Sequence, residues 1–184
     1  MEHDAEPQPW TTVSSRLVYT NPWISVREDI AAMPDGRTTI YGVIDAADAL
    51  GILPFADADH VVLVQQWRYV ANRLTWEMPT GGRKPGESLE DALQRELAEE
   101  IGMAAGSVRP LSVFNTSKSV MDETAYLYVA GDLSPLEVPP DDTEFIRVRT
   151  FAFDDALAMV LSGEIVDAMT IVAVLLADRE RRAV

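Results

Sequence analysis

The most constraining feature of the sequence is the segment 88–101, which has the signals of an amphipathic helix with clear ends. Ser88 with Asp91 three residues later has the form of a capping box, which begins a helix. Gly102 stands where a C-terminal glycine ends one. We therefore expect a helix over 88–101.

Carboxylates lie on the apolar side of this helix. With Leu89 at zero and roughly 100° per residue, Leu93 falls near ~40°, Glu96 near ~340° and Glu100 near ~20°. Glu99 lies at the edge of the apolar arc. A carboxylate on a core-facing stripe is costly unless it is paired or bound to a metal. Two carboxylates one turn apart form a hard oxygen site suited to Mg²⁺ or Mn²⁺.

Other polar residues of the helix allow simpler interpretations. Glu90, Asp91 and Gln94 fit a solvated face. Arg95 lies four residues before Glu99 and can brace it by an i,i+4 ion pair, with an ordinary surface salt bridge as the alternative.

The rest of the chain predicts a mixture of short strands and helices. Strands are expected at 14–20, 23–33, 37–46, 50–55, 60–66, 75–78, 108–116, 123–131 and 144–151, and further helices near 153–161 and 166–181. Residues 79–87 have the composition of a loop. Without a regular βαβ alternation, this order predicts an α+β or α/β sandwich.

Charge and composition exclude several classes of function. A net charge of −15 argues against a nucleic-acid surface, which needs clustered Lys and Arg. No apolar run is long enough to span a membrane, and the acidic, proline-containing first residues are not expected to act as a secretory signal. The chain has no cysteine, which fits a reducing cytoplasm. His3 and His60 are the only histidines, so a nucleophilic triad is not expected.

Read together with the loop before it, the helix is similar to a known family motif. The string is Gly81-x5-Glu87-x7-Arg95-Glu96-Leu97-Ala98-Glu99-Glu100-Ile101-Gly102-Met103. It resembles the Nudix box, Gly-x5-Glu-x7-Arg-Glu-apolar-x-Glu-Glu-x-Gly-apolar, at every fixed position. The resemblance implies a Nudix-type α/β/α sandwich with a mixed sheet. It also implies metal-dependent hydrolysis of a nucleoside diphosphate linked to another group, with Mg²⁺ or Mn²⁺.

The same resemblance assigns roles to residues of the box. Glu96 and Glu100 would be the principal metal ligands, supported by Glu99, and the Thr80 carbonyl could be a further ligand. Structural roles within the box fall to Glu87 and Arg95, which would organise the loop and helix, to Gly81, which would allow a tight turn, and to Gly102.

Residues outside the box resemble the ADP-ribose and nucleotide-sugar pyrophosphatases. The similar stretches are Val64-Gln65-Gln66-Trp67-Arg68-Tyr69, Trp76-Glu77-Met78-Pro79-Thr80-Gly81-Gly82, and the run from Gly163 to Thr170. Thr80 stands where alanine is usual. Arg68 is a candidate contact to a substrate phosphate, because a guanidinium binds oxyanions in a bidentate manner. A structural ion pair is the alternative, and Glu77 is a second candidate substrate contact.

The resemblance also divides the chain into regions. Residues 1–12 are expected to be a flexible tail, 13–47 N-terminal strands that pair with a second subunit in a homodimer, and 48–184 the Nudix domain. Trp23 could stack on a nucleobase, with core or interface packing as the alternative.

In similar ADP-ribose pyrophosphatases the base that activates water lies on a loop before a late strand, so the resemblance implies such a base in this chain. Glu144 is favoured, with Asp142 next, and simple solvation of the loop is the alternative for both. Glu123, in the acidic pair 122–123, could approach the diphosphate or the terminal sugar.

The resemblance implies a small nucleotide substrate, most simply ADP-ribose cleaved to AMP and ribose 5-phosphate. A GDP- or UDP-hexose and a dinucleotide are alternatives. An isoprenoid diphosphate isomerase is disfavoured because cysteine is absent, and a non-catalytic sensor because every carboxylate of the box is present.

Overall fold

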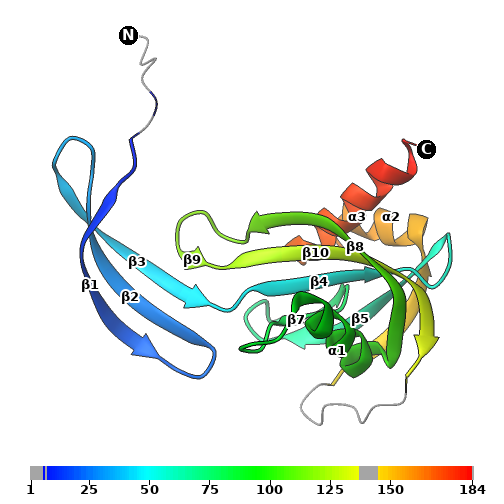
Figure 1. Cartoon of the computed structure of the whole chain (residues 1–184). Coiled ribbons are helices and arrows are strands. Elements are labelled where there is room, and N and C mark those ends of the chain that lie inside the picture. Colours follow the sequence, from blue (N-terminus) through cyan, green and yellow to red (C-terminus); the bar gives the residue numbers. More distant parts are fainter. Residues whose placement is uncertain (1–5, 7, 137–144, 184) are drawn as a thin grey trace. The chain divides into compact units, whose positions relative to one another are not determined.

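The computed structural model describes residues 6, 8–136 and 145–183. The elements run in the order β1 (Thr11–Thr20), β2 (Ile24–Ala32), β3 (Thr38–Ala46), β4 (Ala49–Pro54), β5 (His60–Arg68), β6 (Arg73–Glu77), β7 (Thr80–Gly82), α1 (Leu89–Ile101), β8 (Met103–Asn115), β9 (Met121–Asp122), β10 (Thr124–Pro135), β11 (Arg147–Ala152), α2 (Phe153–Ser162) and α3 (Ala168–Arg181) (Figure 1). None of the described helices is long and apolar enough to span a membrane.

The chain forms two compact units. The N-terminal unit comprises the described part of 1–47 together with 115–123, and the helix-bearing unit comprises 48–114 and the described part of 124–184. In the N-terminal unit the strand order is β1-β2-β3-β9, with β9 parallel to β3 and the other pairs antiparallel. The inclusion of 115–123 was not predicted, because it depends on pairing with a strand far away in the sequence.

Turn chemistry shapes the N-terminal sheet as expected. The Asn21 side chain accepts the backbone N–H groups of Trp23 and Ile24, at 2.8 and 2.9 Å, and so ends the first strand. Gly36 has φ of 83° and its N–H donates to the Met33 carbonyl at 2.9 Å, which makes the predicted hairpin turn.

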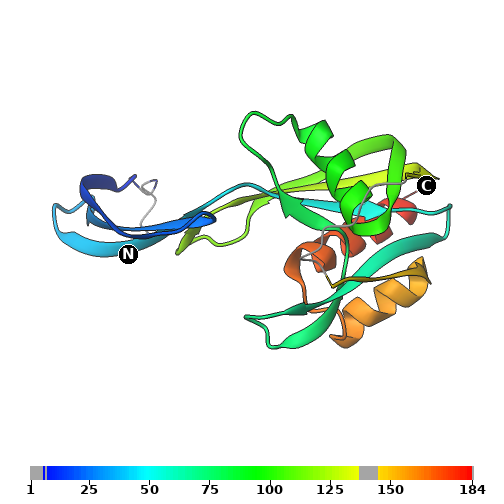
Figure 2. The ribbon, with the colours of Figure 1, turned by 90° about the horizontal axis from the view of Figure 1, so that it is seen from below.

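The helix-bearing unit contains two sheets and all three described helices. The strand orders are β7-β4-β10-β8 and β11-β5-β6. Within this unit α1 lies on one side of the strands and α2 and α3 on the other (Figure 2). The apolar run 61–64 in β5 is buried, as predicted for a strand covered on both faces. These layers bring α1 onto the strands that border the candidate site.

The prediction of a loop over 79–87 is wrong for its first residues. Thr80–Gly82 forms the short strand β7, which pairs antiparallel with β4. A three-residue segment with two glycines carries no hydrophobic alternation, so this strand follows from its tertiary partner and not from its own composition.

Candidate functional site

The site begins with the two core-facing carboxylates of α1. Glu96 and Glu100 are each 6% exposed, whereas the side chain of Glu99 is 33% exposed. Ser88 caps the helix through the Asp91 N–H, and Gly102 ends it at φ of 65°. The predicted helix and the predicted orientation of its acids are both confirmed.

Arg95 joins the loop of the box to the helix. Its guanidinium donates to both carboxylate oxygens of Glu87, at 2.8 and 3.0 Å, and to the Gly82 carbonyl at 2.9 Å. It also donates to Glu96 at 2.6 Å and to Glu99 at 2.9 Å. The predicted i,i+4 ion pair is therefore confirmed. Because Arg95 is only 18% exposed, the alternative of an ordinary surface salt bridge does not hold.

These contacts shift the pKa values of Glu87 and Arg95. Hydrogen bonds from Arg95, the largest influence, together with the Lys84 N–H lower the pKa of Glu87 from its ordinary value of 4.5 to about 2. The pKa of Arg95 is raised above its ordinary value, chiefly by its hydrogen bonds with Glu87. Both groups are thus held in their charged forms near neutral pH.

The buried carboxylates lie against β7. A Cβ at Gly81 would overlap the carboxylate of Glu96, so only glycine leaves that group its place. The Thr80 N–H donates to Glu100 Oε1 at 3.4 Å. Two carboxylates and the backbone of 80–81 therefore converge at one point between α1 and β7.

This donor set fits a hexacoordinate Mg²⁺ or Mn²⁺. Mg²⁺ commonly binds through one or two carboxylates and keeps several waters, to be completed by substrate phosphates. Within the residues that the structure describes, no three acidic or histidine side chains gather into a full metal cage. The fit is therefore to an open coordination site, which would leave positions for water or another ligand, and not to a closed structural site.

Arg68, the last residue of β5, and Glu77, the last residue of β6, form an ion pair. Arg68 Nε donates to Glu77 at 2.9 and 3.0 Å and Nη2 donates at 2.5 Å, while Thr75 donates to Glu77 at 2.6 Å. Glu77 is 1% exposed, whereas Arg68 is 43% exposed and also donates to Thr80 Oγ1 at 3.2 Å. The ion pair that sequence left as the alternative is present, and contacts of either residue with substrate stay predictions.

Four predicted site residues either fall outside the described residues or belong to the N-terminal unit. Glu144 and Asp142 fall outside the described residues. Trp23 and Glu123 belong to the N-terminal unit. Trp23 is 79% exposed and stands in the turn just before β2, so packing in the core of its own chain is excluded. Stacking on a base and packing at an interface both remain open.

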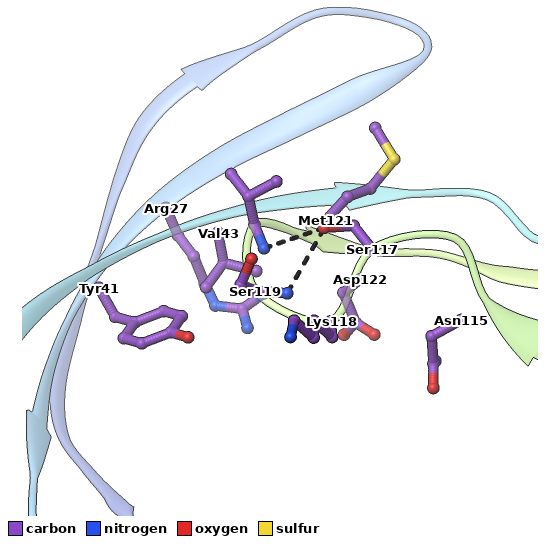
Figure 3. Close-up of a pocket in the computed structure, with 10 residues that line it drawn as sticks. Arg27, Tyr41, Val43, Asn115, Ser117, Lys118, Ser119, Met121 and Asp122 are labelled. Atoms are coloured by element: carbon purple, nitrogen blue, oxygen red, sulfur yellow. Dashed lines mark hydrogen bonds between the residues drawn. The ribbon is translucent and has the colours of Figure 1, made fainter.

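A pocket of about 360 Å³ lies within the N-terminal unit (Figure 3). The Ser117 hydroxyl, which accepts the N–H groups of Ser119 and Val120, shapes one wall. Arg27 and Lys118 line it together with Asp122, but Arg27 is already ion-paired with aspartates of its own sheet. Charges of opposite sign thus lie close together on these walls, whereas the two buried carboxylates lie on α1.

Comparisons with known proteins agree with this geometry. Residues 45–169 match the NUDIX domain family, and residues 10–44 match the nucleoside diphosphate sugar hydrolase N-terminal domain. An ADP-ribose pyrophosphatase from Bacillus subtilis (strain 168) is 29% identical over 89% of this chain and 89% of its own length. An ADP-ribose pyrophosphatase from Mycobacterium tuberculosis (strain ATCC 25618 / H37Rv) is 30% identical over 95% of this chain and 83% of its own.

A solved structure shares the fold. The crystal structure of an ADP compounds hydrolase superposes with a TM-score of 0.86 at 21% identity, covering 97% of each chain. The predicted fold class, a mixed sheet with helices on both sides, is confirmed. With the family match over 45–169 and the box carboxylates held between α1 and β7, these findings show that the chain belongs to the Nudix hydrolase family.

Proposed function

We propose that this Nudix hydrolase cleaves the diphosphate bond of ADP-ribose, giving AMP and ribose 5-phosphate, with Mg²⁺ or Mn²⁺. The observation that carries the proposal is the convergence of Glu96 and Glu100 on the backbone of β7. The names of the similar pyrophosphatases support ADP-ribose as the substrate to test first.

The protein's own groups hold and orient the reactants. Glu96 and Glu100 would hold the metal, with Glu99 and the Thr80 carbonyl as further ligands. A divalent metal held by these groups would supply positive charge against the diphosphate oxygens and would make an attacking water more acidic. Arg95 fixes the side chains of Glu96 and Glu99 through its hydrogen bonds, so their oxygens need little reorganisation when substrate arrives.

A separate carboxylate would take the proton of the attacking water. We assign this role to Glu144, with Asp142 as the alternative, because each belongs to an acidic segment ahead of β11. The proton moves from water to the carboxylate as the water oxygen bonds to one phosphorus of the diphosphate. The bond from that phosphorus to the bridging oxygen breaks, and the bridging oxygen leaves as part of the other phosphate product.

Substrate contacts are proposed for residues near the helix and for the N-terminal unit. Arg68 keeps its guanidinium partly open to solvent while Glu77 holds its plane, which suits an oxyanion contact. Trp23 is exposed enough to stack on a nucleobase, and Glu123 is proposed to approach the terminal sugar.

We also propose a homodimer formed through residues 13–47, and a cytoplasmic enzyme. β1 is the edge strand of its sheet, and all ten of its residues are exposed. Exposed apolar residues of this unit include Val13, Leu17, Val18, Tyr19, Trp23 and Ile40. Exposed apolar side chains on an edge strand are expected to be covered by a partner, and a second copy of the chain is the proposed partner.

The test is nucleoside monophosphate release from a panel of ADP-ribose, GDP-mannose, UDP-glucose and dinucleotides, with Mg²⁺ and with Mn²⁺. Release of AMP from ADP-ribose at the highest kcat/KM is expected. A preference for a hexose-linked nucleotide would retain the mechanism and change the substrate. Binding of these nucleotides without cleavage of any would favour a sensor and contradict the proposed hydrolysis.

A further inference from the structure

A buried hydroxyl links the start of α3 to the short connection between β6 and β7. Thr170 is fully buried, and its Oγ1 accepts the backbone N–H of Met78 at 3.0 Å. The same hydroxyl donates to Asp167 Oδ2 at 2.6 Å. A carboxylate accepts and does not donate, so the hydroxyl proton must point to Asp167 and the lone pairs of Oγ1 remain for Met78.

Capping of α3 does not by itself require this hydroxyl. Asp167 is the N-cap residue, and its carboxylate already accepts the Thr170 backbone N–H at 2.7 Å. The side chain of Thr170 instead makes a bond to a residue distant in sequence. Because Met78 is also fully buried, water cannot replace that acceptor.

The linked backbone leads directly to the candidate metal site. Pro79 follows Met78, and its carbonyl accepts the Ile52 N–H from β4 at 3.0 Å. Thr80, the next residue, donates its N–H to Glu100. The segment 78–80 is therefore held by α3 at one end and by β4 in the middle before it meets the helix carboxylates.

Asp167 is also coupled to the charges around the site. For Arg68 the largest influence is burial, which alone would lower its pKa. Hydrogen bonds and attraction from Glu77, with attraction from Asp167 and Glu100, leave the pKa raised. Asp167 and Glu100 thus both attract the Arg68 guanidinium.

We propose that Thr170, oriented by Asp167, is a positioning residue that sets the backbone of 78–80 and through it the metal-binding geometry of Glu100 and Glu96. This inference rests on the proposed hydrolase function. The proposed positioning role would explain why the run 163–170 resembles the corresponding run of the nucleotide-sugar pyrophosphatases.

The test compares Thr170→Val, which keeps the shape and removes the hydroxyl, with Thr170→Ser, which restores it. Val174→Ala is the matched control, because Val174 is fully buried one turn further along α3 and belongs to the core. Mn²⁺ binding is measured by electron paramagnetic resonance well below the melting temperature of each variant. Amide hydrogen exchange of 78–81 is measured without metal, and kcat and KM with saturating Mg²⁺.

Thr170→Val is expected to weaken Mn²⁺ binding about 10-fold or more, the usual effect of losing a group that supports metal ligands. Exchange at 78–81 should become faster, and kcat should fall more than KM rises. Thr170→Ser should restore Mn²⁺ affinity, the exchange rate at 78–81 and kcat. Val174→Ala should lower the melting temperature and leave these three quantities unchanged. If Thr170→Val does not fold, Asp167→Asn is expected to show the same changes to a smaller degree.

Unchanged Mn²⁺ binding in Thr170→Val, or equal weakening in Val174→Ala, would overturn the inference alone. Wild-type protein that binds no Mn²⁺ and cleaves no nucleotide would overturn the proposed function and the inference with it.

Discussion

At the residue scale, Arg95 connects three carboxylates and one carbonyl of the box. Its partners come from the loop, from β7 and from the helix itself. A guanidinium is suited to this role because its donors lie in one rigid plane. The arrangement keeps Glu96 and Glu99 oriented while Glu87 anchors the arginine from the other side.

The Glu87–Arg95 pair predicts a particular dependence of stability on pH. Because the pKa of Glu87 in the folded protein is about 2 and its ordinary value is 4.5, the pair stabilises the fold fully above 4.5. That contribution is lost as the pH falls from 4.5 to about 2. The free energy of unfolding of the wild type should fall more steeply over this window than that of Glu87→Gln, as measured by denaturant titration. Parallel curves for the two proteins would contradict the assigned contact.

Substitution of Gly81 is expected to lower activity without unfolding the protein. In Gly81→Ala the new methyl group would displace the Glu96 carboxylate, which can swing away because it is the end of a flexible side chain. We expect Mg²⁺-dependent turnover to fall about 10- to 100-fold, with little change in melting temperature. Gly82→Ala is the control, since a Cβ there would meet no described atom within 4 Å. Equal activity of both variants would show that Gly81 does not make room for a metal ligand.

At the element scale, α1 could be predicted in detail and β7 could not. The period of Leu89, Leu93 and Leu97 places Glu96 and Glu100 on the buried face before any tertiary contact is known. Capping residues mark both ends of the helix. The strand Thr80–Gly82 has no such periodicity, and it exists because β4 offers it hydrogen-bond partners.

The segment ahead of β11 carries the proposed base, and mutation tests it. Glu144→Gln should lower kcat while leaving Mn²⁺ affinity close to the wild-type value, because a base contacts the attacking water and not the metal. Asp142→Asn is the matched comparison. If Glu144→Gln keeps the wild-type rate and Asp142→Asn loses it, the role belongs to Asp142.

At the scale of the whole molecule, strand pairing between distant segments determines which residues belong to each unit, and local sequence patterns do not show this pairing. Residues 115–123 join the N-terminal unit because β9 pairs with β3, although both neighbouring strands belong mainly to the other unit. Local patterns predicted the first three strands, but β1 begins at Thr11, three residues before the predicted start and within the part expected to be a tail. Nothing local indicated that a later hairpin would complete their sheet.

The exposed apolar side chains of the N-terminal unit predict a dimer. The wild-type protein should sediment with twice the mass of its 20.3 kDa chain. Leu17→Asp should shift it to the monomer, because it places a charge on the exposed face of the edge strand. Leu161→Asp, on an exposed position of α2, is the control and should leave the mass unchanged. A wild-type mass equal to one chain would contradict the dimer.

We propose that Glu100 and Glu96 form the metal site on which hydrolysis depends. The most direct test is the rate at which Glu100→Gln releases AMP from ADP-ribose in the presence of Mg²⁺. The replacement retains the shape of the side chain and removes its charge, so circular dichroism should match the wild type. We predict that kcat falls by about 100-fold or more, with correspondingly weaker Mn²⁺ binding. Turnover near the wild-type rate would remove Glu100 from the metal site and contradict the account.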